Sequence, residues 1–376
     1  AGTVFFLSAT IDGALRILPI GGFDETGARN CMAVEYRKDI LLIDAGIMFP
    51  EADMPGVDYI IPDLSPLRGR ERDIRGVFIT HGHLDHMGAL PHLLPRIGNP
   101  PVYGSLFTAK LVQKRHADFP HQAKPITHEV RPGDILRVGV FELEAFHEQH
   151  SVPDALGLTV RTPAGTILVT GDWKFDPKPV HDQPAARAHL ERLSQKGVTV
   201  MIGDSTGADK PGATIPEQTV METLEEIFRE NHGRIIASTT SSNVRRIQQL
   251  LALAVQYGRR VAIEGFSMRT NVEIAQELRY VDIPKGTIVS SEESNRLPPQ
   301  KVLILCTGAQ AEREAVLMRI VNKIHRSLKI QPGDAVIFSS RIIPGNEVPI
   351  GRLQDRLSER GVRIYTDRDH PGIHVS

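Results

Sequence analysis

Three histidines and one aspartate fall within six residues, in the string HGHLDH that follows the apolar run GVFIT. Alternate residues of an extended segment point the same way, so His81 and His83 face one volume. Asp85 and His86 stand at the start of a predicted helix and point elsewhere. One loop can therefore serve two adjacent metal ions, the first through His81 and His83 and the second through Asp85 and His86. The alternative is a surface loop that happens to be rich in histidine.

Three further polar residues stand at or just beyond the ends of predicted strands. Asp44 ends DILLID, His150 precedes SVPD, and Asp172 ends GTILVTGD. Each could be an ordinary turn residue, but groups at the carboxyl ends of strands meet at one edge of a sheet. Imidazoles and carboxylates together favour Zn²⁺ or Mn²⁺, whereas Ca²⁺ and Mg²⁺ prefer oxygen ligands. The sequence thus predicts a metal centre at this edge.

The sequence offers no protein nucleophile, because it has neither a GxSxG elbow nor a catalytic-cysteine motif. Its two cysteines, Cys31 and Cys306, stand in apolar runs without CxxC spacing. They indicate buried reduced thiols and a cytoplasmic protein, so any metal must be held by nitrogen and oxygen. Four other histidines have no partner at a ligand-like spacing and are predicted to be surface groups. They are His92, His116, His121 and His128.

The elements change character along the chain. From residue 15 to about 204, short β-rich runs dominate, with helices predicted over 88–94 and 185–195. After residue 204, longer helices alternate with apolar strands, which is typical of a parallel, doubly wound sheet. The Gly- and Pro-rich string GADKPGAT marks a boundary, which predicts domains over 1–206 and 207–370.

Composition excludes some classes of protein. The 376 residues are 41% hydrophobic, and no apolar run approaches the length of about eighteen residues that a membrane span needs. The formal net charge is −1, unlike that of a strongly basic nucleic-acid binder. If the protein binds a nucleic acid, the positive charge that contacts it must be local.

The order Asp, HxHxDH, His, Asp resembles the motifs of the metallo-β-lactamase superfamily. The resemblance implies an αββα sandwich and assigns His81, His83 and His150 to the first metal, and Asp85 and His86 to the second. Asp172 would bridge the metals, and Asp44 would orient the cluster. His150 is preferred to His147 because HSVPD is similar to the family's HSIPD. The implied nucleophile is a hydroxide that bridges two metals about 3.5–4 Å apart.

The second half resembles the β-CASP domain inserted in nucleic-acid-processing members, with Asp204 of GDSTGA as a catalytic residue of its first motif. The resemblance to the ribonuclease J family runs from Leu15 to Ser376. It is carried by LLIDAGIMFPEADMPGVDYIIPD, TGDWKFDPKPV, SSNVRRIQ, VAIEGFSM, CTGAQ and IPGNE. It implies 5′-to-3′ exonuclease and endonuclease activity on single-stranded RNA, leaving a 5′-phosphate and a 3′-hydroxyl.

The same strings imply a set of RNA-contacting residues. They are Ser241, Ser242, Arg245, Arg246, Thr307, Gly308, Gln310, Ser339 and Ser340. The arginines could instead be a solvated helix edge, and the serines could be turn residues. Two departures stand out. The family has His where this chain has Arg245, and Ala309 and Ala311 replace Ser and Gly beside the glutamine, although alanine resists positive φ.

Residues 371–376 are expected to begin a return to the first domain. Members of the resembled family continue there into a helix, a further histidine for the second metal and a dimerising domain. We therefore expect a longer natural chain. The resemblance also implies that it forms a homodimer and binds other RNA-decay factors. The chain as given should hold the first metal better than the second. The alternatives are another β-CASP nuclease acting on DNA or RNA 3′ ends, a catalytically weak RNA-binding subunit of an RNA-degrading complex, and a small-molecule hydrolase.

Overall fold

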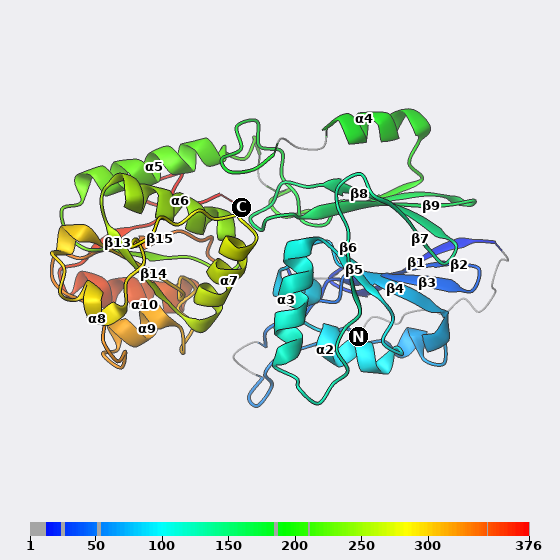
Figure 1. The fold of residues 1–376 in the computed structure, drawn as a ribbon, viewed down its shortest axis with the longest axis horizontal. Coiled ribbons are helices and arrows are strands. Elements are labelled where there is room, and N and C mark those ends of the chain that lie inside the picture. The colour runs from blue at the N-terminus through cyan, green and yellow to red at the C-terminus, as the bar shows by residue number, and fades with distance from the viewer. Residues whose placement is uncertain are drawn as a thin grey trace. The chain divides into compact units, whose positions relative to one another are not determined.

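The computed structural model describes residues 13–23, 27–50, 54–183, 187–209, 211–343 and 345–375. The chain forms two compact units, whose helices and strands are drawn in Figure 1. The first unit comprises Ala1–Glu148, Asp154–Trp173 and Ala186–Lys210, and the second comprises Gln149–Pro153, Lys174–Ala185 and Pro211–Ser376.

The first unit holds two sheets. One has the strand order β1-β2-β3-β4-β5-β6, antiparallel from β1 to β3 and parallel from β3 to β6. The other has the order β11-β10-β9-β8-β7 and is antiparallel except between β10 and β11. The strands are β1 Leu15–Gly21, β2 Cys31–Tyr36, β3 Asp39–Ile43, β4 Ile74–Phe78, β5 Val102–Gly104, β6 Thr127–Glu129, β7 Ile135–Val138, β8 Phe141–His147, β9 Leu156–Thr162, β10 Gly165–Val169 and β11 Val200–Ile202.

The core of the first unit lies between these sheets. Apolar side chains such as Val34, Leu41, Phe141 and Leu158 pack there in one cluster. Strand β3 is buried along its whole length, because helices cover the other face of its sheet (Figure 1). These helices are α1 Leu84–Met87, α2 Leu90–Leu93 and α3 Leu106–Ala117, while α4 Arg187–Lys196 packs on the second sheet. The predicted αββα sandwich is confirmed.

Helix α3 was not among the predicted helices. It begins after Ser105, whose hydroxyl accepts a hydrogen bond from Thr108 N as an N-cap. The prediction that His116 is a surface group is wrong, since this residue of α3 is only 5% exposed. The buried residues of α3 include His116 as well as Phe107 and Leu111.

The second unit is built on a five-stranded parallel sheet in the order β13-β14-β12-β15-β16. Helices flank both faces, as Figure 1 shows, and the sheet confirms the predicted parallel, doubly wound arrangement. The strands are β12 Ile235–Ser238, β13 Arg260–Glu264, β14 Val302–Cys306, β15 Ala335–Phe338 and β16 Arg363–Tyr365. The helices are α5 Glu217–Glu230, α6 Val244–Gln256, α7 Phe266–Glu277, α8 Ser291–Ser294, α9 Val316–Val321 and α10 Glu347–Ser358.

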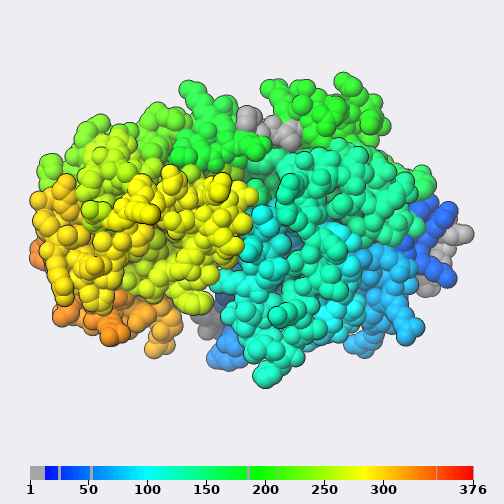
Figure 2. Space-filling model, in the orientation of Figure 1, coloured from blue at the N-terminus to red at the C-terminus, as the bar shows by residue number. Residues whose placement is uncertain are grey.

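The surface of the second unit that faces the viewer in Figure 2 is formed largely by the yellow segment containing α7 and α8. Both cysteines are free and buried, and burial raises the pKa of the Cys306 thiol to about 12. Among the described residues, no helix combines the length and apolarity needed to cross a membrane.

Candidate metal centre

The histidine motif lies where β4 ends and α1 begins. His81 and His83 precede the helix, and Asp85 and His86 lie within it. Backbone hydrogen bonds fix α1 against the segment that follows β3, with Ala45 N donating to His86 O and Ile47 N to Leu84 O. Main-chain hydrogen bonds therefore hold the second half of the motif in place.

Gly46 makes this close approach possible. A Cβ atom at this position would lie 1.5 Å from the carbonyl oxygen of Asp85, which no side chain could tolerate. Because the backbone of residues 44–47 runs against α1, Asp44 and the motif occupy fixed places relative to each other. The sequence DAG thus serves the site through its glycine as well as its aspartate.

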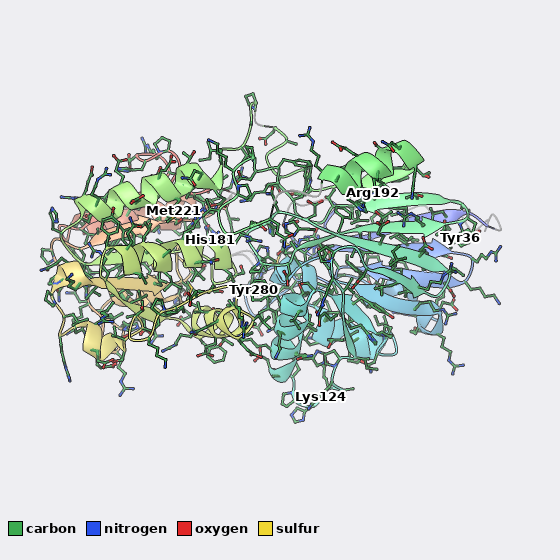
Figure 3. The ribbon with its side chains drawn as sticks, turned by 45° about the horizontal axis from the view of Figure 1, so that its top comes forward. Tyr36, Lys124, His181, Arg192, Met221 and Tyr280 are labelled. Atoms are coloured by element: carbon green, nitrogen blue, oxygen red, sulfur yellow. The ribbon has the colours of Figure 1, made fainter. Side chains whose placement is uncertain are left out.

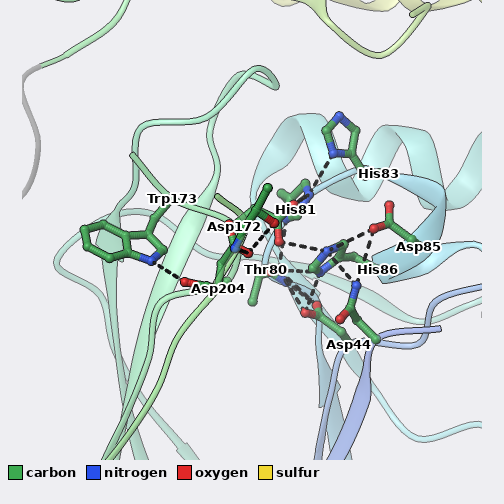
Figure 4. Close-up of polar contacts among 12 residues, drawn as sticks. Asp44, Thr80, His81, His83, Asp85, His86, Asp172, Trp173 and Asp204 are labelled. Carbon is green, nitrogen blue, oxygen red and sulfur yellow. Dashed lines mark hydrogen bonds and ion pairs between the residues drawn. The ribbon is translucent and has the colours of Figure 1, made fainter. Parts of the chain in front are cut away.

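Asp44 lies beneath the motif and is 4% exposed. Its Oδ1 accepts from Thr80 N at 2.8 Å, and its Oδ2 lies 2.8 Å from His86 Nδ1 (Figure 4). Asp44 adopts a φ of +60°, a left-handed conformation that aspartate tolerates better than most residues. With Nδ1 held by this carboxylate, Nε2 of His86 is left to face the cluster.

Two groups of ligand atoms lie close together in the first unit. One contains His81, His83 and Asp172, and the other contains Asp85, His86 and Asp172, with ligand atoms within 4.8 Å of one another in each group. His86 Nε2 is 3.2 Å from Asp172 Oδ1, and His81 Nε2 is 3.8 Å from Asp172 Oδ2 (Figure 4). Asp172, which follows β10, is shared by the groups.

The electrostatics of this cluster fit a bound cation. Burial lowers the pKa of His86, but the carboxylates of Asp172, Asp44 and Asp85 outweigh it and hold that pKa well above 6.5. Burial, followed by the charges of Asp172 and Asp44, raises the pKa of Asp85 to about 6, although His86 opposes the shift. Three carboxylates around an imidazole form a negative site, and a divalent cation would satisfy both its charge and its nitrogen and oxygen donors.

Two residues at the site were missed by sequence reasoning. The hydroxyl of Thr80 is 3.0 Å from Asp44 Oδ2 and 3.1 Å from His81 Nδ1, so it links the aspartate to the first histidine. The amide nitrogen of Asn30, just before β2, is 3.0 Å from His86 Nε2. Thr80 is adjacent to the motif, but a lone asparagine fifty-six residues before His86 carries no signal in the sequence.

A cavity of about 320 Å³ opens beside this cluster within the first unit. Its walls include His86, Asp172 and Asp204 together with the glycine-rich turn after β1. Asp204 lines the cavity, while its Oδ1 accepts from both Thr206 N and Thr206 Oγ1 at 2.8 and 2.7 Å. The volume is at the lower end of the range for small-ligand pockets.

The predicted RNA contacts lie in the second unit, mostly after its three central strands. Ser241 and Ser242 follow β12, Thr307 and Gly308 follow β14, and Ser339 and Ser340 follow β15. Strand β12 pairs with both β14 and β15, so these turns share one edge of the sheet. Gln310 joins two of them, because its Nε2 donates to Arg341 O at 2.6 Å and to Ser340 Oγ at 3.2 Å.

The two arginines at the start of α6 are buried. Arg246 is 1% exposed, and its guanidinium donates to Gln249, Ser339, Glu217 and the carbonyl of Ile373. The interpretation of these residues as a solvated helix edge is wrong, because Arg245 is also only 8% exposed. Ala311 adopts a φ of +57°, the conformation that alanine was expected to resist.

Glu217 stands at the centre of a buried charge cluster in the second unit. Its Oε1 is 2.6 Å from Lys174 Nζ, and its Oε2 is 3.2 Å from Arg246 Nη2. Burial raises the pKa of Glu217, but Arg246 and Lys174 outweigh it and lower that pKa to about 2. His374 lies near these charges, and burial lowers its pKa to about 3.

Comparison with known families completes the account of this site. Residues 24–234 match the family model of the metallo-beta-lactamase superfamily. The chain belongs to this superfamily. Residues 232–357 match the model described as the ribonuclease J, beta-CASP domain. The chain is therefore a metallo-β-lactamase member with a β-CASP region, as its sequence predicted.

Several curated relatives are named ribonuclease J. The protein of Mycobacterium tuberculosis (strain H37Rv) is 40% identical over 364 residues, which are 97% of this chain and 64% of that protein. The Thermus thermophilus protein is 38% identical over 371 residues, again covering 64% of its length. The chain thus spans less than two thirds of the length of these relatives. A crystal structure of an Enterococcus faecalis protein of unknown function has a TM-score of 0.65 at 16% identity, covering 93% of this chain and 87% of that chain, and supports the fold alone.

Proposed function

We propose that the protein hydrolyses RNA phosphodiester bonds with two divalent cations. Its cleavage would combine 5′-to-3′ exonuclease and endonuclease activity and leave a 5′-phosphate and a 3′-hydroxyl. The observation that carries the proposal is the pair of ligand groups that share Asp172. The names of the relatives and the ribonuclease J domain model support RNA as the substrate.

Each residue of the centre has a proposed role. His81, His83 and His150 would hold the first cation, Asp85 and His86 would hold the second, and Asp172, which belongs to both groups, would serve both. His150 belongs to the 149–153 segment of the second unit, three residues beyond the end of β8. When bound, two such cations would lower the pKa of a water molecule and draw charge from the phosphate.

Asp44 and Asp204 act beside the ligands. The Asp44 carboxylate keeps the Nδ1 proton of His86 in place, so that Nε2 stays available as a donor to the cation. Asp204, in the wall of the cavity beside His86, is proposed to orient the substrate there. The cavity would receive the part of the RNA that flanks the scissile phosphate.

The turns after β12, β14 and β15 are proposed to bind RNA phosphates. They bring together hydroxyl groups and backbone N–H groups at the end of β12, the central strand. The strand order reverses at β12, since β14 and β13 lie on one side of it and β15 and β16 on the other. Ligands of doubly wound sheets bind at such a reversal. Ser241, Ser242, Thr307 and Ser340 are half-buried, so part of each remains accessible to a ligand.

The remaining features follow from the same proposal. We propose Zn²⁺ as the cation, with Mn²⁺ as the alternative, and single-stranded RNA as the substrate. We also propose that the protein acts in the cytoplasm as a homodimer and binds other RNA-decay factors. The domain limits stay at 1–206 and 207–370, with residues 371–376 starting the return segment.

The test compares two RNAs of equal sequence, one with a 5′-monophosphate and one with a 5′-triphosphate, using the full-length protein. We expect mononucleotide release from the monophosphorylated RNA, and its loss with chelator or in Asp172→Ala. Asp118→Ala, which removes an exposed carboxylate of the first unit, is the matched control and should retain activity. Metal-dependent cleavage of duplex DNA in place of RNA would refute the proposal, as would RNA binding without any cleavage.

A further inference from the structure

Arg245 is bound to three protein groups within the second unit. Its Nε donates to the carbonyl oxygen of His150 at 2.9 Å, its Nη1 donates to the carbonyl of His181, and its Nη2 is 2.6 Å from Asp182 Oδ1. The side chain is 9% exposed and that of Asp182 is 5% exposed. All three guanidinium nitrogens are therefore engaged inside the protein, away from any phosphate in solvent.

The loop that carries His150 is held on both sides of the histidine. Before it, Gln149 is fully buried, and its Oε1 accepts from Asp176 N at 2.7 Å. Its Nε2 donates to Gln183 O at 3.0 Å. After it, Ser151 O accepts from the backbone N of Arg245 at 3.4 Å. The backbone of the loop is thus tied to the 174–183 segment and to the first turn of α6.

The 174–183 segment depends on such bonds, because it forms neither a helix nor a strand. His181, labelled in Figure 3, has a φ of +58°, a left-handed conformation that costs free energy unless its surroundings hold it. Its carbonyl oxygen is one of the groups that Arg245 binds. A second anchor lies at the other end of the segment, where Asp176 Oδ2 accepts from Glu217 N at 2.8 Å.

We infer that Arg245 is a positioning residue for the metal centre: it holds the main chain of His150 and so sets the direction of that imidazole. The inference rests on the proposed function, in which His150 binds the first cation. Arginine suits the task because its rigid, planar fork reaches three acceptors in two chain segments at once. Lysine could keep the charge opposite Asp182 but could not reproduce the fork. Arg245 therefore acts on the cation through His150 and not on RNA directly.

The experiment measures cation binding in the absence of RNA. Zn²⁺ affinity of the full-length protein would be determined by competition with a chelator for the unaltered protein, Arg245→Lys, and the double variant Arg245→Met/Asp182→Asn. The double variant leaves no unpaired buried charge, so it guards against loss of folding. Arg229→Lys, at an exposed position on α5 with a side chain 62% exposed, is the matched control. Binding of 5′-monophosphorylated RNA in the presence of chelator is the second readout.

We expect both Arg245 variants to bind the first Zn²⁺ about ten- to a hundredfold more weakly, the range for losing a group that orients a ligand. RNA affinity in chelator should stay within about twofold, and Arg229→Lys should change neither quantity. Unchanged Zn²⁺ affinity in both variants would overturn the inference and leave the proposed function standing. Weaker RNA binding with Zn²⁺ affinity intact would also overturn it and would assign Arg245 to phosphate. Unaltered protein that binds neither Zn²⁺ nor Mn²⁺ would overturn the proposed function itself, and the inference with it.

Discussion

Replacing Asp44 with asparagine tests how the buried carboxylate prepares His86 for a cation. The asparagine side chain would keep an oxygen for Thr80 N but would lose the negative charge opposite His86 Nδ1, now 2.8 Å away. If the new amide donates to Nδ1, the imidazole proton moves to Nε2, the nitrogen that faces Asp172. The donor that the second cation needs would then be blocked.

The magnitude follows from the bond that is lost. A hydrogen bond to a charged group contributes about 1.5–3 kcal/mol. Since about 1.4 kcal/mol corresponds to a tenfold change in affinity, Asp44→Asn should weaken binding of the second cation by about ten- to a hundredfold. The fold should remain, because the substitution conserves volume and one of the acceptor oxygens.

Calorimetric titration of the metal-free protein with Zn²⁺, followed by urea unfolding, would measure both effects. Asp118→Asn is the matched control, because its carboxylate is 59% exposed and pairs only with Arg115 among the described ion pairs. Equal affinity for the second cation in Asp44→Asn and the control would refute the reasoning about His86. A fully unfolded Asp44→Asn would refute the claim that the carboxylate acts mainly on the site.

Three further predictions concern single positions. Gly46→Ala should destabilise the protein by about 3 kcal/mol in urea unfolding, since its Cβ would meet Asp85 O at 1.5 Å, and an unchanged midpoint would contradict the close approach. The folded-state pKa of Glu217 is about 2 and its ordinary value is 4.5, so its stabilisation is complete above pH 4.5 and is lost as the pH falls towards 2, by up to about 3 kcal/mol. Glu217→Gln should flatten unfolding free energy across that window, whereas an equally steep loss would point to other carboxyl groups. Ala311→Gly should raise the unfolding free energy by about 1 kcal/mol, because alanine is strained at a φ of +57°. An unfolding free energy below that of the unaltered protein would show that the alanine side chain does not strain this turn.

The sequence predicted the parts of the site that are local. HGHLDH places four side chains within six residues, and Asp44 and Asp172 do stand after strand ends. The prediction that they share one edge of a sheet is wrong, because β3 and β10 belong to different sheets and the site is formed where the two sheets meet. The contributions of Asn30 and Gly46 depend on which strands pair and how closely they approach, so no local pattern reveals them. Helix α3 was not predicted because polar and apolar residues alternate irregularly along it, and its buried residues include Thr108 and His116.

The arginines of α6 show the same limit in the second unit. From the sequence alone, arginine side chains at the start of a helix could equally face solvent, bind RNA or pair with another part of the protein. Only the fold brings Asp182, His181 and the 149–151 segment to Arg245 and brings Glu217 to Arg246. Long-range partners of this kind decide whether a charged side chain is buried, and these partners lie from 29 to 95 residues away.

The central claim is that imidazoles and carboxylates between positions 81 and 172 hold divalent cations. Its most direct test is elemental analysis of the full-length protein after dialysis, compared with the double variant His81→Ala/His83→Ala and with Asp118→Asn. We predict stoichiometric zinc or manganese in the unaltered protein and the control, and a loss of at least one equivalent in the double variant. Protein without bound metal, or equal metal in all three samples, would contradict the account.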